Sequence, residues 1–139
     1  MDYEKIDTNQ VVSESNPFTE ERYRQFFSFM EANRANVLDI GCNTGRGGRV
    51  LKDLNNMFTI SGLDVVQDRL DRLPGDVYGS NIYGSSTNIP VDDGNYDYVT
   101  AGEFVEHLYA KDVDLIFAEM FRVLKTGGMA LLTTPNPND

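Results

Sequence analysis

A glycine-rich turn at residues 41 to 48 carries the residue types that could bind a ligand. It follows the short apolar run Val37 to Ile40, and its glycines stand at positions 41, 45, 47 and 48. Glycine adopts positive φ without steric cost, and its missing side chain lets a ligand lie directly on the backbone amides. The pattern predicts a buried strand, a tight ligand-binding turn and the start of a helix.

The spacing of the glycines separates two classes of ligand. A dinucleotide-binding turn has the pattern G-x-G-x-x-G, which this turn does not follow. The register instead resembles D-x-G-x-G-x-G, the first motif of the class I S-adenosylmethionine-dependent methyltransferases. Asp39, Gly41 and Gly45 match it, and Asn43 replaces the middle glycine. Asn tolerates left-handed backbone, and a negative Asp39 suits a ligand with an ammonium and a sulfonium. A glycine-rich turn without any ligand is the alternative.

A second acidic residue, Asp64, ends a strand predicted at residues 58 to 65, which is rich in β-branched and aromatic residues. It lies 23 residues after Gly41. A carboxylate at the carboxyl end of such a strand can accept hydrogen bonds from both hydroxyls of an adenosine ribose. NAD and S-adenosylmethionine both contain this ribose, so Asp64 alone does not separate them. A solvated aspartate at a strand end is the other interpretation.

The segment from residue 84 to 97 resembles another pattern of the same family, G-D-A-x-x-L-P-F-x-D-x-x-F-D. The matching positions are Gly84, Ile89, Pro90, Asp93, Tyr96 and Asp97. Ser85 stands where the family usually has an aspartate that accepts from the adenine amino group. A serine hydroxyl can accept one such bond, but more weakly than a carboxylate.

The resemblance covers residues 19 to 136 and implies S-adenosylmethionine as the cofactor. Asp39 and the turn would hold its methionine end, Asp64 its ribose and Ser85 and Ser86 its adenine edge. Residues 101 to 103 would form the floor beneath the sulfonium. The expected cofactor-binding residues are Asp39, Gly41, Cys42, Asn43, Thr44, Gly45, Asp64, Val65, Ser85, Ser86, Ala101, Gly102 and Glu103.

His107, the only histidine, follows the fourth predicted strand, where an acceptor could meet the methyl group. Its ordinary pKa of about 6.5 suits a general base for a hydroxyl acceptor. A histidine that only packs or caps a helix is the alternative. Glu103, Glu106 and His107 also form an E-x-x-E-H cluster, and similar clusters bind a divalent metal in small-RNA 2′-O-methyltransferases. Metal sites usually need a further ligand, so no metal is expected.

Helices and strands alternate along the chain, which predicts a parallel sheet covered on both faces. Thr19 is expected to cap a first helix whose apolar face carries Tyr23, Phe26, Phe27 and Met30. This helix would cover the core, and the resemblance adds that it often flanks the cofactor pocket. Further helices are expected at residues 46–55, 67–73 and 112–125, and strands at 37–40, 58–65, within 80–85, at 96–101 and at 129–134.

The predicted fold is an α/β, Rossmann-like three-layer sandwich with sheet order 3-2-1-4-5. About twelve extended residues suffice to join strands three and four, so no helix is required between them. The ligand should bind at the carboxyl ends of strands one and four, where the strand order reverses. Residues 1 to 18 would form a lead-in and residues 19 to 139 the methyltransferase domain.

Family members usually add strands six and seven beyond strand five, and the sequence contains no candidates for them. Strand five would then be an apolar exposed edge, which is an aggregation liability. We therefore expect that the 139 residues are a C-terminally truncated part of a longer protein, or that self-association covers this edge.

Composition narrows the partners. A net charge of −10 repels the phosphate backbone of nucleic acid, so a nucleic-acid acceptor is not expected. The lone Cys42 cannot form an internal disulfide, the first residues lack a signal-peptide pattern, and no apolar run approaches the roughly 20 residues that span a bilayer. These features predict a cytoplasmic protein without a membrane segment.

The expected function is transfer of a methyl group from S-adenosylmethionine to a small-molecule or sugar-type acceptor. One alternative is a non-catalytic S-adenosylmethionine-binding or interaction module. A second is an NAD-dependent oxidoreductase, which the glycine spacing disfavours.

Overall fold

The computed structural model describes residues 18–102 and 110–133 of the chain. In chain order the elements are α2 (Thr19–Ser28), β1 (Ala35–Ile40), α3 (Arg46–Leu54), β2 (Phe58–Asp64), α4 (Gln67–Asp71), β3 (Tyr78–Tyr83), β4 (Tyr96–Ala101), α5 (Ala110–Val123) and β5 (Leu124–Leu132).

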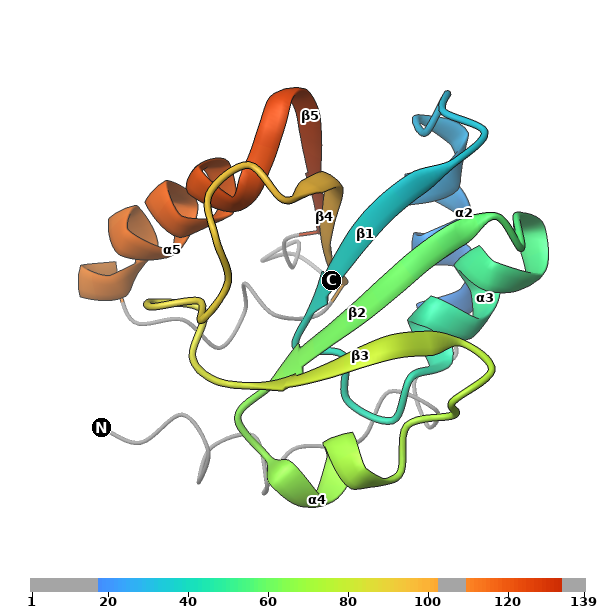
Figure 1. Cartoon of the computed structure of the whole chain (residues 1–139), viewed down its shortest axis with the longest axis horizontal. Coiled ribbons are helices and arrows are strands. Elements are labelled where there is room, and N and C mark those ends of the chain that lie inside the picture. Colours follow the sequence, from blue (N-terminus) through green and yellow to red (C-terminus); the bar gives the residue numbers. More distant parts are fainter. Residues whose placement is uncertain (1–17, 103–109, 134–139) are drawn as a thin grey trace.

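The strands form one five-stranded parallel sheet in the order β3-β2-β1-β4-β5, which confirms the predicted topology (Figure 1). In the pairing of β1 with β2, Ala35 lies opposite Phe58 and Ile40 opposite Leu63. The strand order therefore reverses beside β1, and the carboxyl ends of β1 and β4 lie next to each other. This is the edge of the sheet at which ligands of such folds bind.

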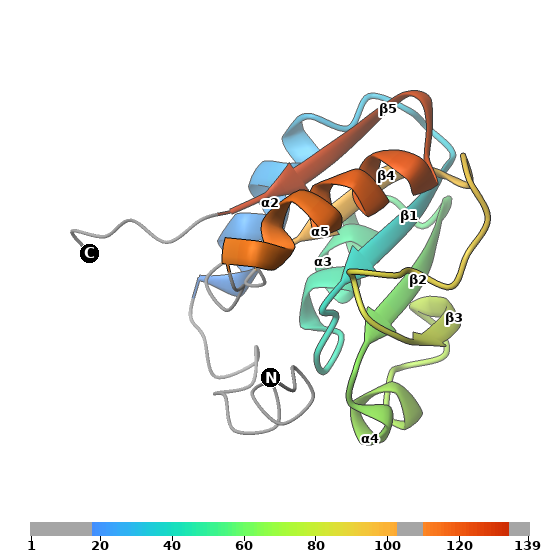
Figure 2. The ribbon, with the colours of Figure 1, turned by 90° about the vertical axis from the view of Figure 1, so that its left-hand side faces the viewer.

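Helices cover both faces of the sheet, with α2 and α3 on one side and α5 on the other (Figures 1 and 2). Successive β1 residues alternate between the two cores, because side chains along a strand point to opposite faces. Val37 packs in the core under α2 and α3, whereas Leu38 and Ile40 pack in the core under α5. Both faces of β1 are thus buried from Val37 onward, which explains why Val37, Leu38 and Ile40 are all apolar although they face different cores.

The first helix begins at Thr19, so the prediction that Thr19 is its N-cap is wrong. Phe18 occupies the cap position, and no side-chain hydrogen bond caps the helix. Thr19 is buried within the first turn. The apolar face is as predicted, since Tyr23 and Phe26 are buried on it.

The boundary between α5 and β5 differs from the prediction, which continued the helix to Lys125 and ended it at Gly127. The helix ends at Val123 because the backbone amides of Gly94 and Asn95 donate to the carbonyls of Arg122 and Val123, each at 2.8 Å. These are carbonyls that a helix end leaves without an intrahelical partner. The chain therefore enters the strand directly after the helix.

Gly127 lies inside β5 with a φ of 84°, so it marks an irregularity of the strand and does not stop a helix. The pairing of β4 with β5 shifts register between Tyr96 and Tyr98. β5 lies at the edge of the sheet, as predicted, and its Met129 is exposed. A further segment or a second copy that covers this edge stays a prediction.

The connection from β3 to β4 contains no helix, as predicted. Among the described residues, no helix has both the length and the apolar character needed to cross a membrane.

Candidate functional site

The turn after β1 reverses the chain by using left-handed backbone at alternate residues. Gly41, Asn43 and Gly45 have φ values of 63°, 54° and 90°. The amides of Gly41 and Cys42 both donate to the carbonyl of Leu63, at 2.8 and 3.1 Å, which holds the turn against the end of β2. The backbone of the predicted binding turn is therefore fixed by the neighbouring strand.

Asp39, the acidic residue before the turn, is fully buried and accepts three hydrogen bonds from hydroxyl groups. Tyr23 and Thr100 donate to Oδ1 at 2.6 and 2.9 Å, and Tyr78 donates to Oδ2 at 2.8 Å. Burial raises the pKa of Asp39 to about 6, while the three hydroxyls act in the opposite direction and the charge of Asp64 adds to the rise. Asp39 therefore joins α2, β3 and β4 to the end of β1.

Burial and the nearby Asp39 charge raise the pKa of both tyrosine hydroxyls well above the ordinary value. Tyr23 and Tyr78 consequently stay protonated at neutral pH and remain hydrogen-bond donors to the carboxylate. Tyr78 also accepts a hydrogen bond from the amide of Gly48 at 3.1 Å. The Tyr78 hydroxyl thereby links Asp39 to an amide in the first turn of α3 that has no partner within the helix.

The two tyrosine rings explain the remaining glycines of the motif. A Cβ on Gly47 would lie 2.3 Å from the Tyr23 ring, and a Cβ on Gly48 would lie 2.2 Å from the Tyr78 hydroxyl. A Cβ on Gly102, just past β4, would lie 2.6 Å from the Tyr23 ring. Tyr23 thus packs between the start of α3 and the end of β4, so α2 both covers the core and borders the predicted site.

Asp64 stands at the carboxyl end of β2 with a side chain that is almost completely buried. Its Oδ2 accepts the amide of Asn43 at 3.0 Å, and its Oδ1 accepts the amide of Val66 at 2.9 Å. The Arg69 guanidinium lies 3.9 Å from Oδ1. Each carboxylate oxygen can accept a further hydrogen bond, so Asp64 keeps the capacity to bind a donor from a ligand.

Asn43 brings one unusual feature to the turn. Its side-chain oxygen Oδ1 is buried and has no hydrogen-bond partner among the described residues. Most buried polar atoms in proteins do have a partner, so an exception calls for an explanation such as an absent ligand.

Ser85 and Ser86 follow β3 and are linked to the end of β2, because the amide of Gly84 donates to the backbone carbonyl of Asp64 at 3.1 Å. The Ser85 hydroxyl shares a 2.7 Å hydrogen bond with the Thr87 hydroxyl and accepts the Thr87 amide at 3.1 Å. Ser86 is buried. The Ser85 hydroxyl is therefore partly occupied by its own loop, which adds to the weakness of serine as an adenine acceptor.

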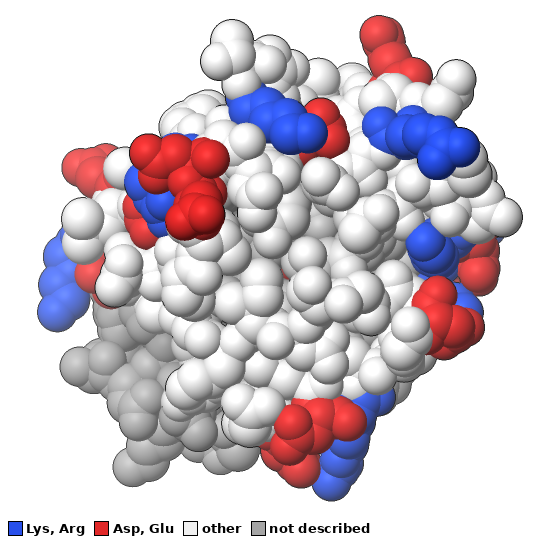
Figure 3. Space-filling view, viewed as in Figure 1, with Lys and Arg blue, Asp and Glu red and all other residues white. Residues whose placement is uncertain are grey.

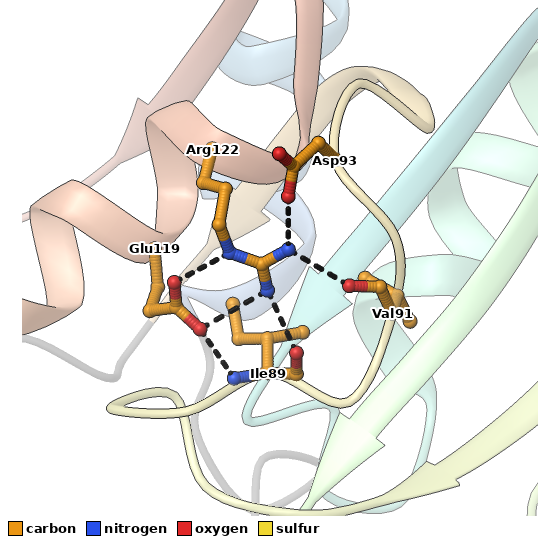
Figure 4. A network of polar contacts seen from close by, with 5 residues as sticks. All are labelled: Ile89, Val91, Asp93, Glu119 and Arg122. Carbon is orange, nitrogen blue, oxygen red and sulfur yellow. Dashed lines mark hydrogen bonds and ion pairs between the residues drawn. The ribbon is translucent and has the colours of Figure 1, made fainter.

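A cluster centred on Arg122 fastens the β3–β4 connection to α5 (Figure 4). The guanidinium donates to the carbonyls of Ile89 and Val91 at 2.8 and 2.9 Å and to Asp93 at 2.7 Å. Glu119 pairs with Arg122 at 2.6 Å and accepts the amide of Ile89 at 2.8 Å. The Arg122 bond lowers the pKa of Glu119. This loop, which carries Ser85 and Ser86 at its start, is held in shape without a helix.

The remaining predicted residues fall into three groups. Ala101 and Gly102 are buried at the end of β4, and the Thr133 hydroxyl donates to the Gly102 carbonyl. Thr44 and Val65 are partly buried in the turns that follow β1 and β2. Glu103, Glu106 and His107 lie outside the described residues. In the part of the chain that the structure describes, no group of three acidic, histidine or cysteine side chains could hold a metal.

The structure thus brings together Asp39, the turn, Asp64 and Gly102. The three hydroxyls on Asp39 were not predicted as part of the site, because Tyr23 fits an apolar helix pattern and Tyr78 and Thr100 lie in strands. One signal was available. Glycine is unfavourable inside a helix, so two glycines in the first turn of α3 indicate a close approach by other groups.

Comparison with known proteins shows the family of the chain. The model of the methyltransferase domain family matches residues 38–132. The chain is 29% identical to a fatty-acid O-methyltransferase of Mycolicibacterium smegmatis over 127 residues, which cover 89% of the chain and 46% of that protein. It is 30% identical to a demethylmenaquinone methyltransferase of Listeria monocytogenes over 111 residues, which cover 74% of the chain and 46% of that protein.

Among solved structures, a putative S-adenosylmethionine-dependent methyltransferase of Methanococcus maripaludis superimposes with a TM-score of 0.73 at 21% identity. The match covers 84% of the chain and 55% of that structure. This likeness shows the fold. The chain spans less than half the length of the two curated relatives.

Proposed function

The chain belongs to the methyltransferase domain family, with the strand order of its class I S-adenosylmethionine-dependent members, and on that premise we propose that it binds S-adenosylmethionine for methyl transfer to a small-molecule acceptor. The observation that carries the proposal is the pair of buried carboxylates, Asp39 and Asp64, which flank the glycine turn at the reversal point of the sheet. The glycine spacing and the family match both disfavour the NAD-dependent alternative.

The chemistry of this turn fits the cofactor. S-adenosylmethionine carries two positive groups, an ammonium and a sulfonium, and two ribose hydroxyls that donate hydrogen bonds. The turn offers the negative charges of Asp39 and Asp64 together with the unpaired Oδ1 of Asn43. Negative charge in a water-poor site attracts cations more strongly than it does in bulk water.

We assign the ribose to Asp64, with Val65 beside it, because both carboxylate oxygens retain acceptor capacity. The turn from Gly41 to Gly45 would hold the methionine end. Asp39 would act there through its charge and by positioning the turn, since its oxygens already accept three hydroxyls. Ser85 and Ser86 would border the adenine, and residues 101 to 103 would lie beneath the sulfonium.

When bound, S-adenosylmethionine supplies an activated methyl group that an acceptor takes by in-line displacement, so the protein mainly has to orient the reactants and exclude water. A hydroxyl acceptor must also lose its proton. We propose His107 as the base that takes it. The acceptor itself would be a small, largely apolar molecule. The names of the two curated relatives, a fatty-acid and a demethylmenaquinone methyltransferase, suggest such acceptors for those proteins.

The face of the molecule seen in Figure 3 supports the proposal of an acceptor other than nucleic acid. In the view of Figure 3, basic and acidic side chains lie side by side around the rim, and this face of the described residues carries no continuous basic patch. A nucleic-acid binder usually concentrates Lys and Arg on one face.

Calorimetric titration with S-adenosylhomocysteine and with NAD tests the cofactor. We expect binding of S-adenosylhomocysteine only, weakened by about 1–3 kcal/mol in Asp64→Asn, because the amide nitrogen replaces one oxygen that would accept from the ribose and that also accepts a backbone amide. Asp68→Asn is the matched control, because this α4 carboxylate is exposed and pairs with the exposed Arg72 at 3.1 Å. Binding of NAD in place of S-adenosylhomocysteine would overturn the proposal.

Methyl transfer is a separate measurement. The protein is incubated with S-adenosylmethionine labelled in its methyl group and with fatty-acid or demethylmenaquinone acceptors, and transfer of the label is followed. Tight cofactor binding without transfer to any acceptor would favour the non-catalytic alternative over the enzyme.

A further inference from the structure

Asn43 occupies the binding turn in a way that is unfavourable for the protein alone. The residue is 9% exposed, and its Oδ1 has no partner among the described residues. Its φ of 54° lies in the left-handed region, which glycine adopts more easily. Glycine at this position would remove both the unpaired oxygen and the backbone strain, and it is the residue that the motif usually has there.

Hydrogen bonds to β2 hold the backbone that carries Asn43. The amide of Asn43 is bound to Asp64 at 3.0 Å, and the amides of Gly41 and Cys42 are bound to the carbonyl of Leu63. The backbone on the N-terminal side of the side chain is thus fixed to β2. The unpaired acceptor therefore belongs to a residue whose backbone amide is bound to the proposed ribose carboxylate.

We propose that Asn43 Oδ1 accepts a hydrogen bond from the α-ammonium group of bound S-adenosylmethionine. This inference rests on the proposed function and assigns one side chain of the site that the family motif does not supply. A buried acceptor that lacks a protein partner is satisfied when a ligand brings a donor to it.

The hydrogen-bond donors of S-adenosylmethionine point to the ammonium as the partner of Asn43 Oδ1. The two ribose hydroxyls donate one hydrogen each, and the two oxygens of Asp64 can accept both. The adenine amino group faces Ser85 and Ser86 in the proposed arrangement. The ammonium has three N–H groups and belongs to the methionine end, which the turn from Gly41 to Gly45 would hold. It is therefore the donor that still needs acceptors near Asn43.

The consequence for specificity is that Asn43 recognises the amino-acid end of the ligand. A turn with glycine here would offer only its backbone. With Asn43, a ligand that has the ammonium should gain a charge-assisted hydrogen bond that adenosine derivatives without the amino acid cannot make. The pair S-adenosylhomocysteine and 5′-methylthioadenosine isolates this difference, because the second ligand keeps the adenine, the ribose and the thioether.

The test compares wild type with Asn43→Gly in titrations with both ligands. The affinity for S-adenosylhomocysteine should fall about tenfold or more, as expected for a lost hydrogen bond to a charged group. The affinity for 5′-methylthioadenosine should not change. The melting temperature without ligand should stay the same or rise, because the variant removes a buried unpaired oxygen and suits positive φ.

Asn43→Asp is the matched control, since it keeps an acceptor and tolerates left-handed backbone. It should retain S-adenosylhomocysteine binding, while its ligand-free stability falls because a third carboxylate joins Asp39 and Asp64. A variant with aspartate that binds as weakly as the glycine variant would argue against an acceptor role.

The remaining outcomes are distinct. Unchanged S-adenosylhomocysteine affinity in Asn43→Gly overturns the inference and leaves the proposed function standing. Equal losses for both ligands place the contact on the adenosine and overturn the ammonium assignment. Wild-type protein that binds neither ligand overturns the proposed function, and the inference with it.

Discussion

The buried carboxylate of Asp39 leads to a pH dependence of stability with an unusual sign. Its pKa is raised from 3.8 to about 6, mainly because burial disfavours the charged form. A rise of about 2 pKa units corresponds to about 3 kcal/mol. Because the native state binds this proton more tightly than the unfolded chain does, the contribution stabilises the fold below about pH 4 and is lost as the pH rises through about 6.

Replacing Asp39 with Asn isolates this effect. The amide oxygen can still accept from Tyr23 and Thr100. The amide nitrogen would face the Tyr78 hydroxyl, which already accepts from Gly48 and would lose the acceptor for its own proton. That loss should cost about 1–3 kcal/mol at any pH, whereas relief of the buried charge operates only near neutral pH. The two effects oppose each other at pH 7.

Urea unfolding of wild type and Asp39→Asn between pH 4 and pH 7 provides the measurement. The free energy of unfolding of wild type minus that of the variant should decrease by about 2 to 2.5 kcal/mol across this range. Asp68→Asn on the exposed surface of α4 serves as control and should show a nearly constant difference. If wild type instead gains relative stability as the pH rises, the three hydroxyl donors outweigh burial and the account of Asp39 is wrong.

Two further predictions concern the packing of Gly47 against Tyr23 and the attachment of the β3–β4 connection to Arg122. Gly47→Ala should destabilise the fold by about 1–3 kcal/mol in thermal unfolding, because the new methyl group meets the Tyr23 ring. Tyr23→Ala combined with it should cost less than the sum of the two single changes; strict additivity would contradict the proposed clash. Arg122→Met should speed amide hydrogen exchange at Ile89, because the Arg122 guanidinium no longer fixes the β3–β4 connection. Arg24→Met, on the exposed face of α2, should leave this exchange unchanged. Equal exchange at Ile89 in both variants would refute the role of Arg122.

The glycine turn and most of the helices and strands were predictable from the sequence, because each depends on local patterns, and the resemblance to the family added the strand order. The apolar run before the turn, the glycine spacing and Asp64 at a strand end are each encoded within a few residues. The partners of Asp39 were not predictable in this way. Tyr23 and Tyr78 lie 16 and 39 residues from it and reach it only through the packing of α2 and β3.

The end of α5 illustrates the same distinction. Gly127 looked like a helix stop from its position alone. The helix ends earlier because Gly94 and Asn95, which lie before β4, donate to its last carbonyls. Hydrogen-bond donors from a distant part of the chain override the local sequence signal, and Gly127 instead lies within β5.

The place of Tyr23 has a practical consequence for the limits of the folding unit. The family match begins at residue 38, after α2 has ended. A polypeptide that begins there would lack Tyr23, which is one of the three hydroxyl donors to Asp39. It would also lack the ring that packs against Gly47 and Gly102. The smallest piece that can reproduce the site in an expression experiment must therefore include α2 from Thr19 onward, although this helix lies outside residues 38–132, which the family model matches.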